Sequence, residues 1–356
     1  MEVKSHVYIV FIVLTTVILP FIYWYFNNDG FKRIINKYSP FKRVQFDSIV
    51  KLEDAHLIIK NKEFLNDTKV SQKFKYIFWP VTPTVSPNII HLLSLYNLTQ
   101  LSKYGLRIVV FIFDSYYEMI TNKSKKIVKQ EVKKFQNDLK QMGLRNCRYK
   151  VKKESKYVEN KLNQDGFAKR FYSYMGSIKY GELVDLKKPH VGSDTPSIRF
   201  FKSVLNMLYL KLVPYKVGFT FSGYDEKKLW DIFSKNPVDG QNMRLTNFYL
   251  PMLPKLSGGQ TNALDKDNNI TIDDSEKDIY NKINNNLDCL ESNGLIKIVL
   301  EVFFQTGEKI NVQINDTDSR EYTQFDQIKS DLQTDELKDK ILISISKKIH
   351  GFFHQK

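Results

Sequence analysis

Cysteine is scarce in this sequence. Only Cys147 and Cys289 occur among its 356 residues. A disulfide-stapled fold needs several cysteine pairs, and a zinc site needs cysteine or histidine ligands at short, regular spacings. The sequence therefore predicts neither a disulfide framework nor a metal site.

Acidic residues are also in short supply. The chain has 39 Asp and Glu against 54 Lys and Arg, which gives a formal net charge of +15 at pH 7. So basic a chain is expected to meet a polyanionic partner, either a nucleic acid or an anionic membrane surface. The charge alone does not distinguish these partners. With 42% hydrophobic and 26% charged residues, the chain has enough apolar material for two ordinary domains.

Charge is missing altogether from one apolar run, which begins at Val7 and ends at Phe26. As a helix, this run is long enough to span a hydrocarbon core of about 30 Å. Aromatic residues cluster at its end, around Trp24, where membrane–water boundaries favour them. A cleaved signal peptide is the alternative, but such peptides have shorter apolar regions and a small-residue cleavage site. We therefore predict a single-pass membrane anchor over residues 1–26.

The charges around this run predict its orientation. A basic linker, residues 27–46, follows the anchor, whereas only Glu2 and Lys4 carry charge before it. Basic residues concentrate on the cytoplasmic side of membrane spans, so the large C-terminal part is expected to face the cytoplasm. The same cations would be attracted to anionic headgroups. The sequence does not say which membrane is used.

Residues 76–119 alternate strand and helix signals. An apolar run over 76–79 leads through a Pro-rich turn to apolar residues at helical spacing from Ile89 to Leu98, and a second apolar run covers 107–113. Gly105 is placed to end the helix. Two such runs joined by one helix predict a βαβ crossover in a parallel sheet, with a ligand crevice at the carboxyl ends of the strands.

A second helix is predicted over residues 122–142, with an apolar stripe that includes Val128, Val132 and Phe135. Lysines surround that stripe. A solvated outer face is the ordinary explanation; a surface that binds the phosphates of tRNA or another polyanion is the alternative. The lysines of this candidate surface are Lys125, Lys126, Lys129, Lys133 and Lys134, with Lys338, Lys340, Lys347 and Lys348 near the C-terminus.

Three segments carry a resemblance to a known family. Residues 83–91 read Pro-Thr-Val-Ser-Pro-Asn-Ile-Ile-His, residues 222–228 read Ser-Gly-Tyr-Asp-Glu-Lys-Lys, and residues 250–259 read Leu-Pro-Met-Leu-Pro-Lys-Leu-Ser-Gly-Gly. They resemble the first signature, the nucleotide-site turn and the approach to the second signature of class I aminoacyl-tRNA synthetases. The tyrosyl enzymes in their archaeal and eukaryotic form are most similar, with the tryptophanyl enzymes next. The resemblance covers about residues 76–352.

This resemblance implies a domain organisation and a site. It implies a Rossmann-like α/β catalytic domain over 47–249 with a connecting insertion at about 144–199, a second-signature loop and junction over 250–280, and a C-terminal α-helical, anticodon-binding-like domain over 281–356. In the family the insertion builds a homodimer, so a homodimer is expected. The implied substrate and nucleotide pocket consists of Phe78, Trp79, Thr84, His91, Asp114, Gly223 and Asp225.

The chain departs from the family where the chemistry is done. Asn88 replaces the first signature histidine and Ile90 the signature glycine, which leaves only His91. The second signature reads Gln260, Thr261, Asn262, without the family's lysine. Losing one such transition-state contact costs on the order of 3 kcal/mol. We therefore assign no catalytic residue and expect no cofactor; ATP and Mg²⁺ would be needed only by an active enzyme.

Other changes point the same way. Pro80 and Val85 replace glycines, and Phe78 replaces the family's substrate-cradling tyrosine. Where the family binds the substrate amine, this chain has approximately Val204, Leu208 and Lys211. We therefore predict a membrane-anchored, synthetase-like pseudoenzyme that binds RNA or another partner. Two alternatives stay open: an active, divergent tyrosine-tRNA ligase using His91 and Asp225, and a scaffold subunit of a membrane protein complex.

Overall fold

The structure, a computed structural model, describes residues 57–60, 76–162, 217–235, 245–257, 268–290 and 294–355, with three further helical positions at 169, 173 and 176. Residues 44–356 form one compact unit. The predicted anchor, the basic linker, most of the insertion and the second-signature residues Gln260, Thr261 and Asn262 lie outside the described residues. Among the helices that the structure describes, none is long and apolar enough to cross a membrane.

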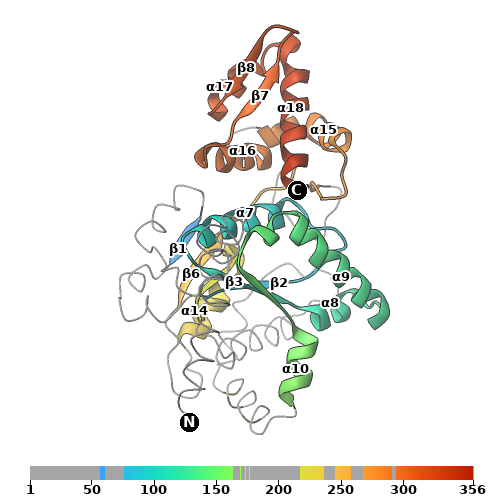
Figure 1. The fold of residues 1–356 in the computed structure, drawn as a ribbon, viewed down its shortest axis with the longest axis vertical. Coiled ribbons are helices and arrows are strands. Elements are labelled where there is room, and N and C mark those ends of the chain that lie inside the picture. Colours follow the sequence, from blue (N-terminus) through green and yellow to red (C-terminus); the bar gives the residue numbers. More distant parts are fainter. Residues whose placement is uncertain are drawn as a thin grey trace, which may run out of the picture. The chain divides into compact units, whose positions relative to one another are not determined.

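A six-stranded sheet forms the centre of the α/β part of this unit (Figure 1). Its strand order is β1-β6-β5-β2-β3-β4, and all neighbours are parallel except β1, which runs antiparallel to β6. The α/β prediction is confirmed. The strands are β1 (Ile58–Lys60), β2 (Tyr76–Val81), β3 (Arg107–Ile112), β4 (Tyr149–Lys153), β5 (Val217–Gly223) and β6 (Thr246–Leu250).

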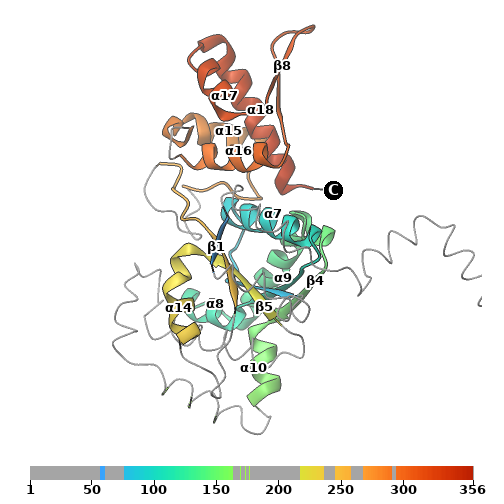
Figure 2. The same ribbon diagram turned by 90° about the vertical axis from the view of Figure 1, so that its left-hand side faces the viewer.

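Both faces of this sheet are covered, which explains why β2 and β3 are continuous apolar runs. Ile77 and Trp79 join a core cluster with residues of α7 (Ile89–Lys103) and α9 (Lys125–Gln141). On the opposite face Phe78 packs on Phe111, 5.5 Å between ring centroids. Figure 2 shows α7 and α10 (Glu154–Leu162) on opposite sides of the sheet.

The prediction of one helix over 122–142 was wrong at its start. A separate helix, α8 (Asp114–Thr121), ends at Asn122, whose φ of 53° is left-handed, and α9 begins only at Lys125. Asparagine tolerates this conformation better than most residues. Leu144–Asn146 forms a short 3-10 helix, η3, between α9 and β4.

The C-terminal part of the described chain is helical apart from one hairpin. Its helices are α15 (Glu276–Asn284), α16 (Leu295–Gln305), α17 (Phe325–Asp331) and α18 (Asp335–Phe353), with a short 3-10 helix, η5 (Leu287–Leu290), and an antiparallel hairpin of β7 (Ile310–Gln313) and β8 (Ser319–Tyr322) (Figure 1). The hairpin was not predicted. Ser275 caps the start of α15 in a capping box with Asp278.

Candidate functional site

The sheet itself indicates where a ligand crevice lies. From β2 the chain continues to β3 and β4 on one side of β2, and it then returns to form β5 and β6 on the other side. The direction of strand addition therefore reverses between β2 and β5. In open α/β sheets this switch point carries the ligand crevice, outside the carboxyl ends of the strands. The first-signature segment follows β2, and the turn at Gly223 ends β5. Two of the three resembling motifs therefore meet at this place.

Asn88, in the first-signature segment, is the N-cap of α7. Its side-chain oxygen accepts hydrogen bonds from the backbone N–H groups of Ile90, at 3.1 Å, and His91, at 3.4 Å. The ring atom Nδ1 of His91 lies 2.8 Å from the same oxygen. The backbone N–H of Asn88 donates to the same Nδ1 at 3.3 Å, which completes a capping box at the start of α7. The two polar side chains of the degenerate signature thus bond each other and the helix end.

His91 is also shielded from solvent. Its side chain is 6% exposed, and its ring meets the ring of Phe135 edge to face, with centroids 5.3 Å apart. Desolvation by this burial lowers the pKa of His91 to about 4. At neutral pH the ring is uncharged, so it offers no cation to a phosphate group.

The segment after the second signature closes onto the first-signature segment. Ile89 N–H donates to the Ile270 carbonyl, and Ile272 N–H donates to the Pro87 carbonyl, each at 2.9 Å. Asn88 and Thr271 pair as an isolated antiparallel bridge. These backbone contacts bring the flanks of both signatures together, although Gln260, Thr261 and Asn262 themselves lie outside the described residues.

Side chains strengthen this closure in a group that we name the Asp273 clamp: Ser86, Asp273 and Lys134. The Ser86 hydroxyl donates to the Asp273 carboxylate, and Lys134 Nζ lies 3.0 Å from the same carboxylate. The buried Thr84 supports the turn by donating to the Ser86 carbonyl at 2.9 Å. Sequence reasoning missed the clamp, because no local pattern links Ser86 with a partner 187 residues away.

Phe78 and Trp79, assigned to the pocket by resemblance, are core residues. Phe78 is fully buried and Trp79 is 4% exposed. They lie on opposite faces of β2, Trp79 in the cluster with α7 and Phe78 against Phe111. Their contacts are those expected of alternate residues on a strand that is covered on both faces.

Asp114 serves a helix end rather than an open pocket. Its carboxylate accepts from the backbone N–H of Ser155, at 2.9 Å, at the start of α10. In return Glu154, which is 3% exposed, accepts from the backbone N–H of Tyr116, at 3.1 Å, at the start of α8. The two carboxylates thus cap each other's helices at the carboxyl ends of β3 and β4.

Gly223 and Asp225 form a tight turn at the end of β5. A Cβ atom at Gly223 would lie 2.3 Å from an Asp225 carboxylate oxygen, so any side chain there would displace that carboxylate. Asp225 itself is exposed. A side chain at Gly223 would therefore turn the exposed Asp225 carboxylate aside, and that carboxylate lies at the switch point.

Tyr249, on β6 beside this turn, was not singled out from the sequence. Its side chain is fully buried, and its hydroxyl has no hydrogen-bond partner among the described residues. The ring of Tyr224 meets it edge to face at 5.9 Å. Burial, together with the charges of Asp231 and Glu226, raises the pKa of the Tyr249 phenol. An unsatisfied buried hydroxyl costs roughly 1–3 kcal/mol.

Helix α9 carries an excess of positive charge. Its two acidic residues are paired: Glu131 with Lys123 at 2.7 Å, and Asp138 with Lys134 at 3.0 Å. Lys134, predicted as a polyanion contact, is thus held by Asp138 and the Asp273 clamp. The remaining lysines of α9 are exposed and make no ion pair within the described part of the chain. They are Lys125, Lys126, Lys129, Lys133 and Lys140.

The described residues contain no candidate metal site. Among the described residues, no group of three or more His, Cys, Asp or Glu side chains is arranged to hold a metal ion. Cys147 and Cys289 are both buried free thiols.

No protein-family model and no curated protein matches the sequence. Solved structures do match in fold. Tyrosyl-tRNA synthetase from Archaeoglobus fulgidus, complexed with L-tyrosine, has 16% identity and a TM-score of 0.71 over 87% of this chain and 97% of that one. Tyrosyl-tRNA synthetase from Aeropyrum pernix has 12% identity and a TM-score of 0.66 over 86% of this chain and 94% of that one. A tryptophanyl-tRNA synthetase from Encephalitozoon cuniculi, bound to tryptophan, has 11% identity and a TM-score of 0.61 over 91% of this chain and 94% of that one. This chain therefore has a Rossmann-like fold similar to that of the class I tyrosyl- and tryptophanyl-tRNA synthetases.

Proposed function

We propose that this chain is a tyrosyl-tRNA-synthetase-like protein that keeps the synthetase fold, does not activate tyrosine, and binds RNA through the cationic face of α9. One observation carries the loss of activation. His91, the last conventional side chain of the first signature, is neutral, buried and bonded to the cap of its own helix.

The chemistry of activation explains why this matters. Adenylate formation builds negative charge on phosphate and pyrophosphate oxygens, so the site must supply cations or well-aimed hydrogen-bond donors. At the first signature, Asn88 directs its oxygen to the helix cap, Ile90 adds a β-branched side chain, and His91 carries no charge. None of the three stabilises a developing phosphate charge.

The Asp273 clamp opposes triphosphate binding further. It fixes a carboxylate beside the first-signature turn, where an ATP triphosphate would need positive charge. Lys134, the cation nearest to it, is already shared between Asp273 and Asp138.

RNA binding is supported by the charge of α9. Like charges three or four residues apart, such as Lys129 and Lys133, repel each other and destabilise a helix. A polyanion would relieve this repulsion and release its counterions. The exposed lysines cover the side of α9 that faces away from its buried stripe of Val128, Val132 and Phe135.

Two measurements on the full chain, purified in a non-ionic detergent, test the proposal. Tyrosine-dependent exchange of pyrophosphate into ATP should not exceed the blank, with an active tyrosyl-tRNA synthetase assayed in parallel. RNA binding should weaken with salt, with a log–log slope of about −3 if four lysines each neutralise a phosphate of a single strand. Robust pyrophosphate exchange would refute the loss of tyrosine activation. Absent or salt-independent RNA binding would refute the proposed role of the α9 lysines.

An active, divergent tyrosine-tRNA ligase is the second candidate, because Asp225 presents an exposed carboxylate at the switch point beside Gly223. A carboxylate there is suited to hold a ribose or an amine. If exchange is detected, Asp225→Asn should abolish it, while Glu226→Gln on the next residue should leave it nearly unchanged.

The remaining parts of the proposal concern the assembly. We propose that the run from Val7 to Phe26 anchors the protein in a membrane with the C-terminal part towards the cytoplasm, and that two copies form a homodimer. Carbonate extraction, protease protection and light scattering in detergent measure these properties. If the chain is instead a scaffold subunit of a membrane complex, affinity isolation should recover a protein partner in stoichiometric amount, and RNA binding should be absent.

A further inference from the structure

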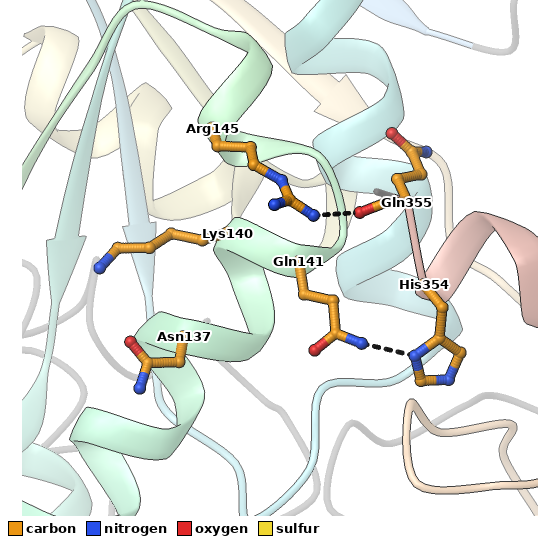
Figure 3. A pocket seen from close by; sticks show the side chains of 6 residues that line it. All are labelled: Asn137, Lys140, Gln141, Arg145, His354 and Gln355. Atoms are coloured by element: carbon orange, nitrogen blue, oxygen red, sulfur yellow. Dashed lines mark hydrogen bonds between the residues drawn. The ribbon is translucent and has the colours of Figure 1, made fainter.

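A recess lies where the C-terminal end of α9 meets the end of α18. Its cavity has a volume of about 350 Å³ (Figure 3). We name it the junction pocket, and its lining residues are Asn137, Lys140, Gln141, Arg145, His354 and Gln355.

Direct hydrogen bonds between its two sides fix the shape of this pocket. Gln141 Nε2 donates to His354 Nδ1 at 2.6 Å, and the Arg145 guanidinium donates to the Gln355 carbonyl (Figure 3). Gly143, with a φ of +114°, permits the Gln355 side chain to pack against the turn, because a Cβ there would lie 2.8 Å from Gln355 Oε1. The pocket is therefore largely preformed.

The pocket has hydrogen-bond donors to spare and no acid in its lining. Lys140 and Asn137 make no side-chain hydrogen bond or ion pair within the described part of the chain, and Arg145 gives only one of its five N–H donors to Gln355. The helix ends at this place contribute a partial negative charge of roughly half a unit each. The carboxylates of Asp138 and Asp273 also act on His354, but both pair with Lys134. Within the lining itself, Lys140 and Arg145 are the charged groups that an anion would meet.

The pocket lies at the end of the same face of α9 that carries the exposed lysines. Lys126, Lys129 and Lys133 follow one another at intervals of three and four residues, and the same intervals lead on to Asn137 and Lys140. Residues at these intervals share one helix face, with one turn about every 5.4 Å. A strand of phosphates that follows this face arrives at the junction pocket.

We propose that the junction pocket binds one nucleotide unit of a single-stranded or looped RNA, with its flanking phosphates at Lys140 and Arg145. Figure 3 shows both cations on the α9 side of the pocket, with the Arg145 side chain directed towards Gln355 and the Lys140 side chain extending outward from α9. The volume exceeds the needs of a lone phosphate and lies in the range of small-molecule sites. Unpaired RNA can turn a nucleotide into such a recess, whereas a bilayer presents its headgroups on a plane.

This inference rests on the proposed RNA binding, and the test separates the two. A fluorescently labelled single-stranded RNA is titrated with full-length wild type, Lys140→Gln and Lys126→Gln, and binding is followed by anisotropy. The two variants remove the same charge from exposed positions of one helix, but only Lys140 lines the pocket. Lys140→Gln should weaken binding roughly tenfold or more, as expected for a charge-assisted hydrogen bond. Lys126→Gln should weaken it only about twofold.

The other outcomes are equally decisive. If both variants lose RNA affinity equally, the proposed nucleotide pocket is refuted and the proposed RNA binding stands. If the wild type binds no RNA, both proposals are refuted. Preference for a duplex over the single strand of the same sequence would also refute a pocket for an unpaired nucleotide. Binding to phosphatidylserine vesicles that depends on Lys140, without binding to RNA, would reassign the site to a lipid headgroup. Matching thermal melting curves for the three proteins exclude a folding defect.

Discussion

Lowering the pH should destabilise this fold through His91, whose ring is buried in the cap of α7. Its pKa falls from 6.5 to about 4 on folding. The native state therefore holds this ring neutral, while the unfolded chain binds a proton below pH 6.5, so stability is present above pH 6.5 and is lost as the pH falls towards 4. Between pH 8 and pH 5 the loss from His91 alone should be about 2 kcal/mol, and below pH 4 it should level off at about 3 kcal/mol.

Urea unfolding of the wild type and His91→Gln, at pH 8 and pH 5, isolates this contribution. Glutamine does not titrate, and it is accepted at this position of a capping box. The variant should be less stable at pH 8, because it loses the contact with Phe135. That deficit should shrink by about 2 kcal/mol at pH 5, since only the wild type must hold a histidine neutral. All other titrating groups are common to both proteins and cancel.

A deficit that is the same at both pH values would refute the reasoning. It would mean that the His91 ring titrates near its ordinary pKa and therefore reaches solvent or a compensating charge. If His91→Gln does not fold, the His91 ring signal followed by NMR across pH 4 to 8 gives the same answer: no titration above pH 5 is expected.

Three further predictions concern single contacts. Tyr249→Phe should raise the unfolding free energy by about 1 kcal/mol, because it removes a buried hydroxyl without a partner among the described residues; a loss of stability in urea would indicate a partner. Asp114→Ala should lower it by about 1 kcal/mol through the lost cap of α10, and an unchanged urea midpoint would contradict that role. Gly143→Ala should lower the melting temperature, because φ there is +114° and Cβ would meet Gln355, whereas Gly351→Ala, with open space around it, should raise it slightly; equal shifts would refute the steric argument.

Much of the α/β domain could be predicted, because its signals are local. The runs that became β2 and β3 are apolar at nearly every position, which is typical of parallel strands covered on both faces. Gly105, with a φ of 101°, follows α7 as predicted. The hairpin of β7 and β8 was missed because each strand has only four residues, too few for a clear alternation.

The candidate site was harder to predict, because its decisive contacts are distant in sequence. The motif frame of residues 83–91 located the first signature, but nothing in it shows that His91 turns into the cap and meets Phe135 of another helix. The resemblance placed Asp114 in the pocket, yet its partner is the backbone of Ser155. Such roles depend on which helix end comes to lie beside which side chain.

The order of the sheet also bears on how copies of this protein can associate. In the described sheet β4 is an outermost strand, and its sequence, Tyr-Lys-Val-Lys-Lys, places exposed lysines at 150 and 152. Lysine on an outermost strand discourages the addition of a further strand from another molecule, and so protects against aggregation by sheet extension. Self-association of this chain should therefore use helical surfaces rather than a sheet continued across β4.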